Sequence, residues 1–561
     1  MRTLFIHQPF RFDIHESCLP TIIPRNLLSL GASLMARGFP VAVHDMQINR
    51  LGPESIRYAL RTYRPDLVGI GIHAAPFIPA VKVCCEAVKA ENPSVPIVVG
   101  GIFTSTYGEK IFDVIPEIDI VVLNEGEETI VELAEAIANR KPLTSVPGLV
   151  VRNGRGEVRE SPPRGIIEDL NALPLPAWDL VDLPRYRRSG LLPPYIEAQR
   201  GCSYSCTFCG VHFPNRGQIV RYRDPRRIVD EIELLYGRYG FDRFFFCDDT
   251  FTLNYTFAGK ICDEITARNL QNRVKWTAYT RADRIEPNVA RKLRAAGCYC
   301  LALGVETGAR QDTASINKRE TITEYEQGIQ IIKDAGMDVH TLIIFGFPEV
   351  THNDIPMAAK FLLKTRPTMS QFFIFHPTPG TEYFAHPEKF GLHYRFDKLE
   401  DWYKTDFIEE PLCDTKHLTR EEIIKDFIQY NLAFHSYESP GERPGLQQRL
   451  LCDAIPRKRH EVVLMRTGEL CLYVRPGAPH GSVYGDMHKN ARRLNEMQYE
   501  VLLRSNGDFT IEEIAERFAK LFDFTSEDAL LYVVNALRRF ERLELIHELP
   551  ALSEYEHLMV S

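Results

Sequence analysis

The sequence has little of what marks a membrane-bound or nucleic-acid-binding protein. Among its 561 residues, no apolar run reaches the roughly 20 residues that a transmembrane helix needs. The N-terminal residues lead directly into a strand-like segment, without the charged, apolar and cleavage regions of a signal peptide. The formal net charge of −8 argues against nonspecific binding to nucleic acid or anionic membranes. We therefore expect a globular cytoplasmic protein of about three domains.

Cysteine is also scarce, and most of the 13 cysteines lie in apolar or amphipathic runs that are typical of a buried core. A disulfide framework is therefore not expected. Three cysteines are an exception to this core pattern. Cys202, Cys206 and Cys209 lie together in the run Arg200-Gly-Cys-Ser-Tyr-Ser-Cys-Thr-Phe-Cys-Gly210. Their C-x3-C-x2-C spacing supplies three thiolate ligands and leaves a metal site one ligand short.

One interpretation of the cysteines is a structural zinc site, which His212 could complete as a Cys3His set. Zinc ribbons usually pair two short knuckles, and the chain has no second C-x2-C. The spacing, with Phe208 before the last cysteine, instead resembles the signature of radical S-adenosylmethionine (SAM) enzymes. That resemblance implies a [4Fe-4S] cluster held by the three cysteines. Its fourth iron would bind SAM and cleave it to a 5'-deoxyadenosyl radical.

Residues 1–140 alternate short apolar segments with amphipathic ones. This pattern predicts a parallel, doubly wound Rossmann-like sheet, because strands that are apolar throughout need helices on both faces. Ligands of such folds bind at the carboxyl ends of the strands. The loops expected there, 73–77, 100–104 and 124–127, are small or glycine-rich. The expected strands are 3–10, 41–45, 67–72, 97–101 and 118–123, and the expected helices are 26–37, 55–63, 80–91, 108–114 and 129–139.

The Gly-Gly pair and the Asn-Glu-Gly-Glu run in these loops resemble the cobalamin-binding domain that is fused to many radical SAM enzymes. Cobalamin proteins that ligate cobalt through histidine carry D-x-H-x-x-G, whereas Cys18 follows Asp13-Ile-His15 where glycine is expected. We expect no imidazole ligand, with the 73–77 loop covering the lower face of cobalt. The alternative is a flavodoxin-like module without a ligand. The resemblance implies these cobalamin-binding residues: His73, Ala74, Pro76, Gly100, Gly101, Ile102, Asn124, Glu125, Gly126 and Glu127.

Residues 141–190 are expected to form a hairpin at 148–159 and a proline-rich linker. From 191 to 395 the alternation resumes with longer periods. Six strand and helix units predict a partial (β/α)6 barrel with its site at the carboxyl ends of the strands. The expected strands are 196–199, 243–247, 275–279, 299–305, 339–345 and 371–375, and the expected helices are 225–239, 255–268, 288–296, 322–335 and 355–364.

This span resembles the radical SAM core of the branch with an N-terminal cobalamin domain. The resemblance rests on Asp248-Asp-Thr-Phe251, Gly304-Val-Glu-Thr-Gly308 and Pro377-Thr-Pro-Gly-Thr381; the run Gly346-Phe-Pro-Glu349 departs from it, because a glycine usually follows the proline. A buried zwitterion needs a cation for its carboxylate and carboxylates for its ammonium group. The alternative for each acidic residue is a helix cap. The resemblance implies these SAM-binding residues: Phe208, Asp248, Asp249, Arg281, Glu306, Thr307 and Gly346.

Residues 396–455 are expected to form a helical connector, and residues 456–550 show a strand pair and three helical stretches typical of a winged helix. DNA binding is disfavoured, because residues 491–546 contain 8 Lys plus Arg and 11 Asp plus Glu, a net charge of −3. The run 494–514 resembles the PqqD-like peptide-binding module, also called the RiPP (ribosomally synthesised peptide) recognition element. That resemblance implies a precursor peptide bound as an added strand. The alternative is a module for packing or dimerisation.

Together these patterns predict a cobalamin-dependent radical SAM C-methyltransferase that acts on an unactivated carbon of a ribosomally made peptide or protein. The implied cofactors are a [4Fe-4S] cluster, SAM and cobalamin, with a flavodoxin-like or ferredoxin-like one-electron reductant. An alternative is a radical SAM cyclase, rearrangement enzyme or epimerase acting on a peptide or small molecule. From another class, the chain could be a peptide-binding regulatory iron-sulfur protein without turnover.

Overall fold

The computed structural model describes residues 1–9, 22–189, 192–210, 219–307, 316–352, 354–394 and 411–420, the strands at 463–467 and 470–474, and residues 422, 423, 427, 516 and 519. The chain divides into two compact units. The first contains residues 1–13, 19–407 and 411–420, and the second contains residues 14–18, 408–410 and 421–561. Within the described residues, no helix combines the length and the apolar character that crossing a membrane would require.

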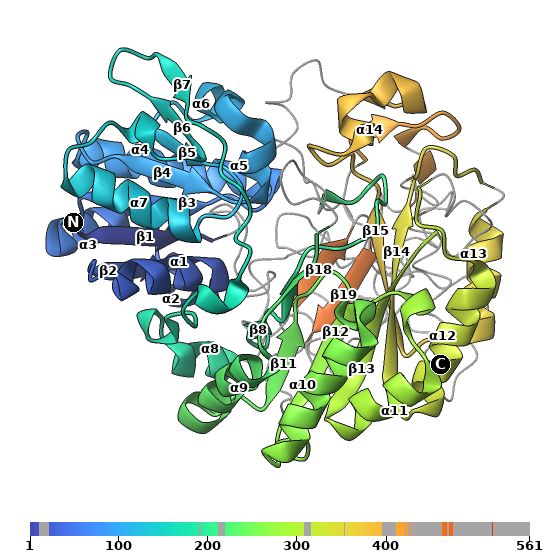
Figure 1. The fold of residues 1–561 in the computed structure, drawn as a ribbon. Coiled ribbons are helices and arrows are strands. Elements are labelled where there is room, and N and C mark those ends of the chain that lie inside the picture. Colours follow the sequence, from blue (N-terminus) through green and yellow to red (C-terminus); the bar gives the residue numbers. More distant parts are fainter. Residues whose placement is uncertain are drawn as a thin grey trace, which may run out of the picture. The chain divides into compact units, whose positions relative to one another are not determined.

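The N-terminal part of the first unit is built on a seven-stranded sheet in the order β2-β1-β3-β4-β5-β6-β7 (Figure 1). Neighbouring strands from β2 to β5 pair in parallel, whereas β6 and β7 add antiparallel strands at one edge. The predicted doubly wound fold is confirmed. The strands are β1 (Thr3–His7), β2 (Val41–Asp45), β3 (Leu67–Gly71), β4 (Ile97–Gly100), β5 (Ile120–Val122), β6 (Leu149–Arg152) and β7 (Val158–Glu160).

Helices cover both faces of this sheet. Helices α1 and α7 pack together, as do α3 and α4. Alternate strand residues belong to two separate cores: Leu4 and Ile6 lie in one and Phe5 in the other, as the two-residue period of a strand requires. The helices are α1 (Arg25–Ala36), α2 (Met46–Asn49), α3 (Glu54–Tyr63), α4 (Ile78–Glu91), α5 (Ile102–Tyr107), α6 (Ile111–Val114) and α7 (Glu127–Ala138).

Two details of this part differ from the expectations. The helix expected at 108–114 is present as the 3-10 turn Gly108–Lys110 and the short helix α6. An additional short helix, α5, precedes it, and the φ of 57° at Gly108 separates the two. The hairpin expected at 148–159 is present as β6 and β7, but it extends the N-terminal sheet rather than lying in a separate linker.

The second sheet of the same unit has six strands in the order β15-β14-β13-β12-β11-β8, and every neighbouring pair is parallel. Among the described residues no pairing joins β15 to β8, so the barrel is open, as predicted. The strands are β8 (Tyr195–Ile196), β11 (Arg243–Phe246), β12 (Lys275–Thr280), β13 (Cys298–Glu306), β14 (Asp338–Phe345) and β15 (Met369–Ile374).

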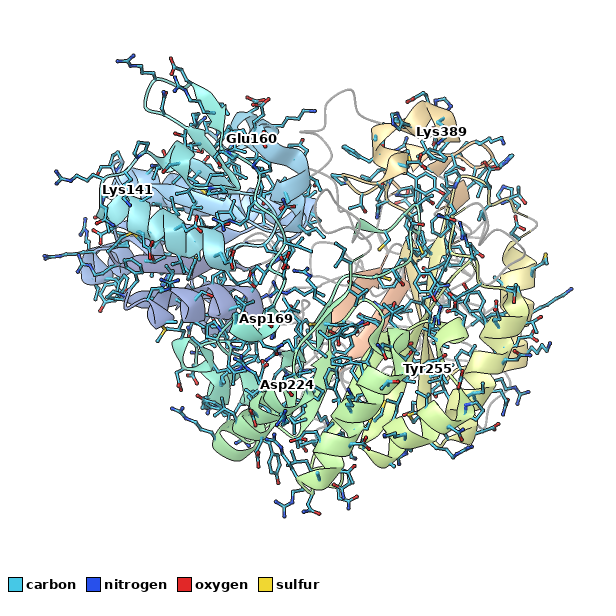
Figure 2. All side chains as sticks on the ribbon, in the orientation of Figure 1. Lys141, Glu160, Asp169, Asp224, Tyr255 and Lys389 are labelled. Atoms are coloured by element: carbon cyan, nitrogen blue, oxygen red, sulfur yellow. The ribbon has the colours of Figure 1, made fainter. Side chains whose placement is uncertain are left out.

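The barrel helices begin where the sequence offers a cap. Asp224 accepts the backbone N–H of Arg226 at the start of α9, and the proline at the first helical position fits there without losing a hydrogen bond (Figure 2). Thr321 and Glu324 form a reciprocal capping box at the start of α12. The helices are α8 (Leu183–Ser189), α9 (Pro225–Tyr239), α10 (Tyr255–Ala267), α11 (Pro287–Ala295), α12 (Ile322–Asp334), α13 (Ile355–Thr365) and α14 (Glu382–Ala385).

The strand expected at 196–199 is split. After β8 the chain leaves the main sheet, and β9 (Gln199–Arg200) pairs antiparallel with β10 (Arg221–Tyr222). Two further short strands, β16 (His393–Tyr394) and β17 (Cys413–Asp414), also pair. The cysteine run follows β9 directly, so the pairing of β9 with β10 fixes the start of the cysteine loop.

In the second unit, β18 (Val463–Thr467) and β19 (Leu470–Val474) form an antiparallel hairpin, as the strand-like run broken at residues 467–468 predicted. The three helical stretches expected between 496 and 542 and the helical connector at 396–455 lie mostly outside the described residues, as does the Asp13-Ile-His15 segment. The winged-helix interpretation therefore stays a prediction.

Candidate active site

The cysteine loop starts from a constrained backbone. Gly201 has a φ of 92°, and a Cβ atom there would lie 2.4 Å from the carbonyl oxygen of Ile219. Only glycine fits this close approach. Cys202 is buried, with its Sγ atom 3.8 Å from the hydroxyl of Thr250. The backbone N–H of Cys209 donates to the carbonyl of Cys206, which closes a turn between these two cysteines.

The donor set fits an iron-sulfur cluster, which cysteine thiolates hold, because three cysteines lie on one short loop. In the described part of the chain, no three His, Cys, Asp or Glu side chains lie close enough together to hold a single metal ion. His212, the fourth ligand of the zinc alternative, lies outside the described residues.

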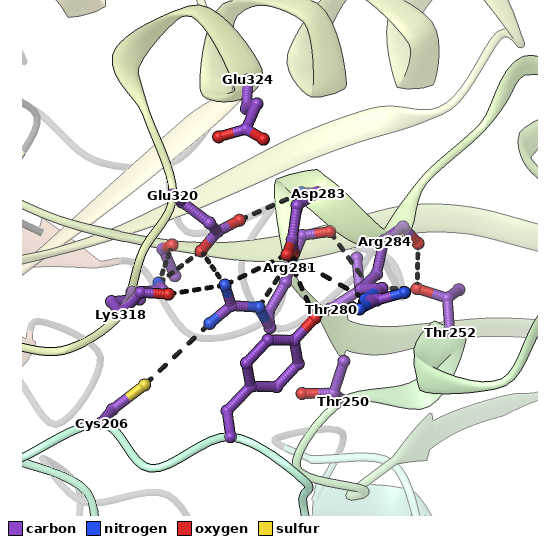
Figure 3. Close-up of polar contacts among 12 residues, drawn as sticks. Cys206, Thr250, Thr252, Thr280, Arg281, Asp283, Arg284, Lys318, Glu320 and Glu324 are labelled. Carbon is purple, nitrogen blue, oxygen red and sulfur yellow. Dashed lines mark hydrogen bonds and ion pairs between the residues drawn. The ribbon is translucent and has the colours of Figure 1, made fainter. Parts of the chain in front are cut away.

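Arg281, expected to bind the SAM carboxylate, lies next to the cysteine loop, just after the end of β12 (Figure 3). Its guanidinium group is 4.0 Å from the sulfur of Cys206 and 3.6 Å from the ring centroid of Tyr204. It also donates to Asp283 at 2.9 Å and to the carbonyl of Lys318 at 2.8 Å. Burial alone would lower the pKa of Arg281, but the hydrogen bond to Asp283 and the charge of Glu320 raise it. Arg281 is thus a permanent cation beside the thiols.

Glu306 ends β13 and is the partner of a buried lysine that the sequence analysis did not identify. Its carboxylate lies 2.7 Å from Nζ of Lys318, which is also 3.3 Å from Glu320. Burial alone would lower the pKa of Lys318, but the charge of Glu306 raises it. The φ of 64° at Glu306 places this residue in the left-handed region, which is uncommon outside glycine. Glu306 therefore faces a buried cation at the barrel mouth.

The two adjacent aspartates differ. Asp248 is buried, and its Oδ1 atom accepts the backbone N–H groups of Ala198 and Gln199 at 2.8 and 2.7 Å. Among the described residues, its Oδ2 atom has no hydrogen-bond partner. Burial raises the pKa of Asp248 to about 8, despite these two hydrogen bonds. Asp249 is exposed instead. Asp248 thus holds the backbone just before the cysteine loop, and Asp249 is the one that faces outward.

Phe208 packs edge-on against Phe347, with ring centroids 5.4 Å apart. Gly346, with a φ of 82°, turns the chain just before Phe347, and Thr307 is buried beyond the end of β13. An apolar wall next to polar groups suits a ligand that has both an aromatic base and charged ends. The predicted SAM-binding residues thus lie on the cysteine loop and at the carboxyl ends of β11 to β14.

The loops expected to bind cobalamin follow β3, β4 and β5, which are neighbours in the sheet. The His73 ring lies 5.8 Å from that of Phe77. Solvent reaches part of the imidazole, yet burial among its neighbours, and then the charge of His7, lower the pKa of His73 to about 4. Gly101 has a φ of 130°, and a Cβ there would lie 2.3 Å from the carbonyl oxygen of Ile72. The edge is thus mostly neutral backbone and small side chains, which fits a large flat ligand. Ala74, Pro76, Gly100 and Ile102 lie in the same loops.

The third loop behaves differently from its prediction. Asn124 has a φ of 63°, and its backbone N–H donates to the hydroxyl of Ser105. The carboxylates of Glu125 and Glu127 are both held by arginine side chains of the barrel part. The side chains of both glutamates are therefore engaged in ion pairs. The backbone around Gly126 is the part of this loop that can contact a cofactor.

Sequence reasoning missed Tyr204, Lys318 and Glu320. Tyr204 stacks on Arg281, while Lys318 and Glu320 complete the charge set around Glu306. The signal that was available is the run Lys318-Arg-Glu320, three charged residues in sequence placed between a buried strand and the α12 cap.

Two family models match the chain. The Radical SAM superfamily model matches residues 196–362, and the B12 binding domain model matches residues 17–134. These matches coincide with the barrel and with the N-terminal sheet. The chain thus contains a B12 binding domain and a radical SAM domain, whose cofactors are cobalamin and a [4Fe-4S] cluster with SAM.

Known proteins resemble the chain over most of its length. An uncharacterized methyltransferase of Pyrococcus horikoshii is 28% identical over 435 residues, which cover 78% of this chain and 92% of the relative. The anaerobic magnesium-protoporphyrin IX monomethyl ester cyclase of Rubrivivax gelatinosus is 26% identical over 437 residues, covering 76% and 75%. The solved structure of the cobalamin-dependent SAM radical enzyme OxsB, with aqua-cobalamin and SAM bound, superposes with a TM-score of 0.64 at 15% identity, over 99% of this chain and 83% of that one. This last likeness supports the fold.

Proposed function

We propose that the enzyme transfers a methyl group to an unactivated carbon of its substrate. The observation that carries the proposal is that one compact unit contains both a B12-binding part and a radical SAM barrel with three cysteines after its first strand. The relative from Pyrococcus horikoshii is named a methyltransferase, which agrees with this reaction. When bound, the cofactors supply an electron, a hydrogen-abstracting radical and a methyl group.

The residues of the chain would orient these groups. The proposed cluster ligands are Cys202, Cys206 and Cys209. The loops after β3 and β4 would hold cobalamin, together with the backbone of the 124–127 loop after β5. The charged residues at the barrel mouth suit a zwitterionic ligand, because Arg281 offers a cation and Glu306 a carboxylate. The proposed SAM contacts are Phe208, Asp248, Asp249, Arg281, Glu306, Thr307 and Gly346.

A ribosomally made peptide remains the proposed substrate class, supported by the resemblance of residues 494–514 to peptide-binding modules. The proposed domains are 1–140 for cobalamin, 191–395 for the barrel and 456–550 for the peptide. We further propose a cytoplasmic location, where a flavodoxin-like or ferredoxin-like protein can supply electrons.

A second candidate is cyclisation of a small molecule, because a protoporphyrin ester cyclase aligns over three quarters of the chain. One experiment separates the two. Anaerobic enzyme receives cobalamin, reductant, SAM with a deuterated methyl group, and either a synthetic peptide encoded next to the gene or a small-molecule extract of the host.

Methyl transfer predicts a product that carries the deuterated methyl group, formed together with 5'-deoxyadenosine. A product of altered mass without deuterium would contradict methyl transfer and favour cyclisation. If a compound of the extract gains the deuterated methyl group and the peptide does not, methyl transfer is supported and the peptide is refuted as the substrate.

A further inference from the structure

A cluster of charged side chains links the B12-matching part to the barrel, and it is separate from the residues that surround Arg281. Arg200, the last residue of β9, contacts three carboxylates, two from the 124–127 loop and one from Glu197. Its guanidinium nitrogens lie 3.0 Å from Glu125, 2.6 Å from Glu127 and 3.1 Å from Glu197. Arg221 also contacts Glu125, at 2.8 Å. We call these five residues the Arg200 cluster.

The cluster is largely buried, and Glu125 is its most heavily bonded member. The side chain of Glu125 is 3% exposed, and its Oε2 atom also accepts the backbone N–H of Ile167 at 2.8 Å. Burial alone would raise the pKa of Glu125, but the hydrogen bond from Arg221 and the charge of Arg200 lower it to about 2. Glu125 therefore stays ionised well below neutral pH. A buried ion pair with several hydrogen bonds fixes geometry strictly, because leaving either partner unpaired is costly.

The residues of the Arg200 cluster adjoin the two loops that are expected to hold the cofactors. Glu125 and Glu127 flank Gly126, between the end of β5 and the start of α7. Arg200 stands two residues before Cys202, and Gly201 between them is held against the Ile219 carbonyl. A shift of Arg200 is therefore passed to the first cysteine, and a shift of Glu127 is passed to the loop of the B12-matching part.

We infer that Arg200, with Glu125 and Glu127, is a positioning residue that sets the separation between the cobalamin-binding loop and the cysteine loop. The inference rests on the proposed function for its purpose, because methyl transfer requires both cofactors to face one substrate. A second contact agrees with this role: Arg25, the first residue of α1, lies 3.7 Å from Glu197 and 3.5 Å from Glu231 of α9. The two parts are thus tied at two places.

The barrel offers a matched control. Arg268 also contacts three carboxylates, at 2.6 Å from Asp230, 3.0 Å from Glu233 and 2.7 Å from Glu264. Its side chain is 21% exposed, against 17% for Arg200, but all its partners lie on α9 and α10. Arg268→Gln therefore removes the same number of ion pairs, with more exposed partners, without touching either cofactor loop.

The test compares Arg200→Gln, Glu127→Gln and Arg268→Gln with the wild type. Glu127→Gln is the milder variant, since Arg200 keeps Glu125 and Glu197. Without cofactors, hydrogen exchange should rise together in residues 122–130 and 198–206 for the first two variants and stay unchanged there for Arg268→Gln. With cobalamin bound and the cluster reduced, pulsed electron paramagnetic resonance should show a broader cobalt-to-cluster distance distribution in the first two only.

Turnover gives a third readout. The methylated product formed per 5'-deoxyadenosine should fall by about tenfold in Arg200→Gln, because misplacement of reacting groups by 1 Å can cost about 100-fold. Arg200→Lys should recover part of this ratio. The inference is overturned if Arg200→Gln and Arg268→Gln have the same effect on hydrogen exchange, on the cobalt-to-cluster distance and on the product ratio. It is also overturned if Arg200→Gln and Glu127→Gln change none of these three quantities. A wild type that makes no methylated product while the exchange and distance results hold would refute the proposed function alone.

Discussion

The two parallel sheets of the first unit present different chemistry at the carboxyl ends of their strands. In the barrel this edge carries buried charges, with Arg281 beside the thiols and Lys318 against Glu306. In the N-terminal sheet it carries a neutral imidazole at His73 and a glycine turn at Gly101. A charged edge suits a zwitterion, and a neutral edge lined by backbone suits a large flat ligand. One fold principle thus supplies two different cofactor sites.

The largest effect is expected at the cysteine loop. Changing Cys202, Cys206 or Cys209 to Ala should abolish 5'-deoxyadenosine formation, because a cluster that loses a thiolate cannot be held. The control is Cys262→Ala, which removes a buried thiol from α10 far along the chain from the loop. Anaerobic assays with dithionite measure the product. Formation of 5'-deoxyadenosine by all three variants would refute the cluster assignment.

The next effect concerns the buried charges of the barrel. Lys318→Met should lower the free energy of unfolding by about 3–5 kcal/mol, because Glu306 and Glu320 lose their buried cation. Lys292→Met is the control, since its pair with Asp263 is exposed and worth about 0–1 kcal/mol. Denaturant unfolding measures both. Equal losses in the two variants would mean that the barrel charges are no more coupled than surface charges.

A smaller effect is expected from Gly101→Ala. The added methyl group meets the Ile72 carbonyl in a backbone conformation that costs about 1–3 kcal/mol, so cobalamin binding should weaken while 5'-deoxyadenosine formation continues. Gly108→Ala is the control, because its φ of 57° is also left-handed but nothing lies within 4 Å of the added atom. Spectroscopic titration with cobalamin measures both variants. Unchanged cobalamin binding by Gly101→Ala would show that this turn does not belong to the cobalamin site.

The smallest effect concerns pH. Burial raises the pKa of Asp248 to about 8 from an ordinary 3.8, so the folded protein binds a proton that the unfolded chain releases. The resulting stability is fully present below about pH 4 and is lost as the pH rises through 8. Asp248→Asn, which keeps the Oδ1 acceptor, should flatten the dependence of unfolding free energy on pH between 5 and 8. An unaltered slope would show that Asp248 is ionised in the fold.

The sequence periodicity predicted the main strands of both sheets, because continuous apolar runs and 3.6-residue stripes are local properties. Three features could not be predicted. The pair of Glu306 with Lys318 depends on the path of the intervening chain, and the pair of Arg200 with Glu125 joins residues 75 positions apart. The division of the first barrel strand into β8 and β9 depends on pairing with β10, which lies beyond the cysteine loop.

The most direct test of the comparison between the two edges is the metal content of anaerobically purified protein from cells supplied with cobalamin. The wild type should contain about four irons and about one cobalt per chain. Cys206→Ala should lose iron and keep cobalt, while Gly101→Ala should lose cobalt and keep iron. Stoichiometric zinc in place of iron, or loss of both metals together in each variant, would contradict the account of two independent cofactor sites.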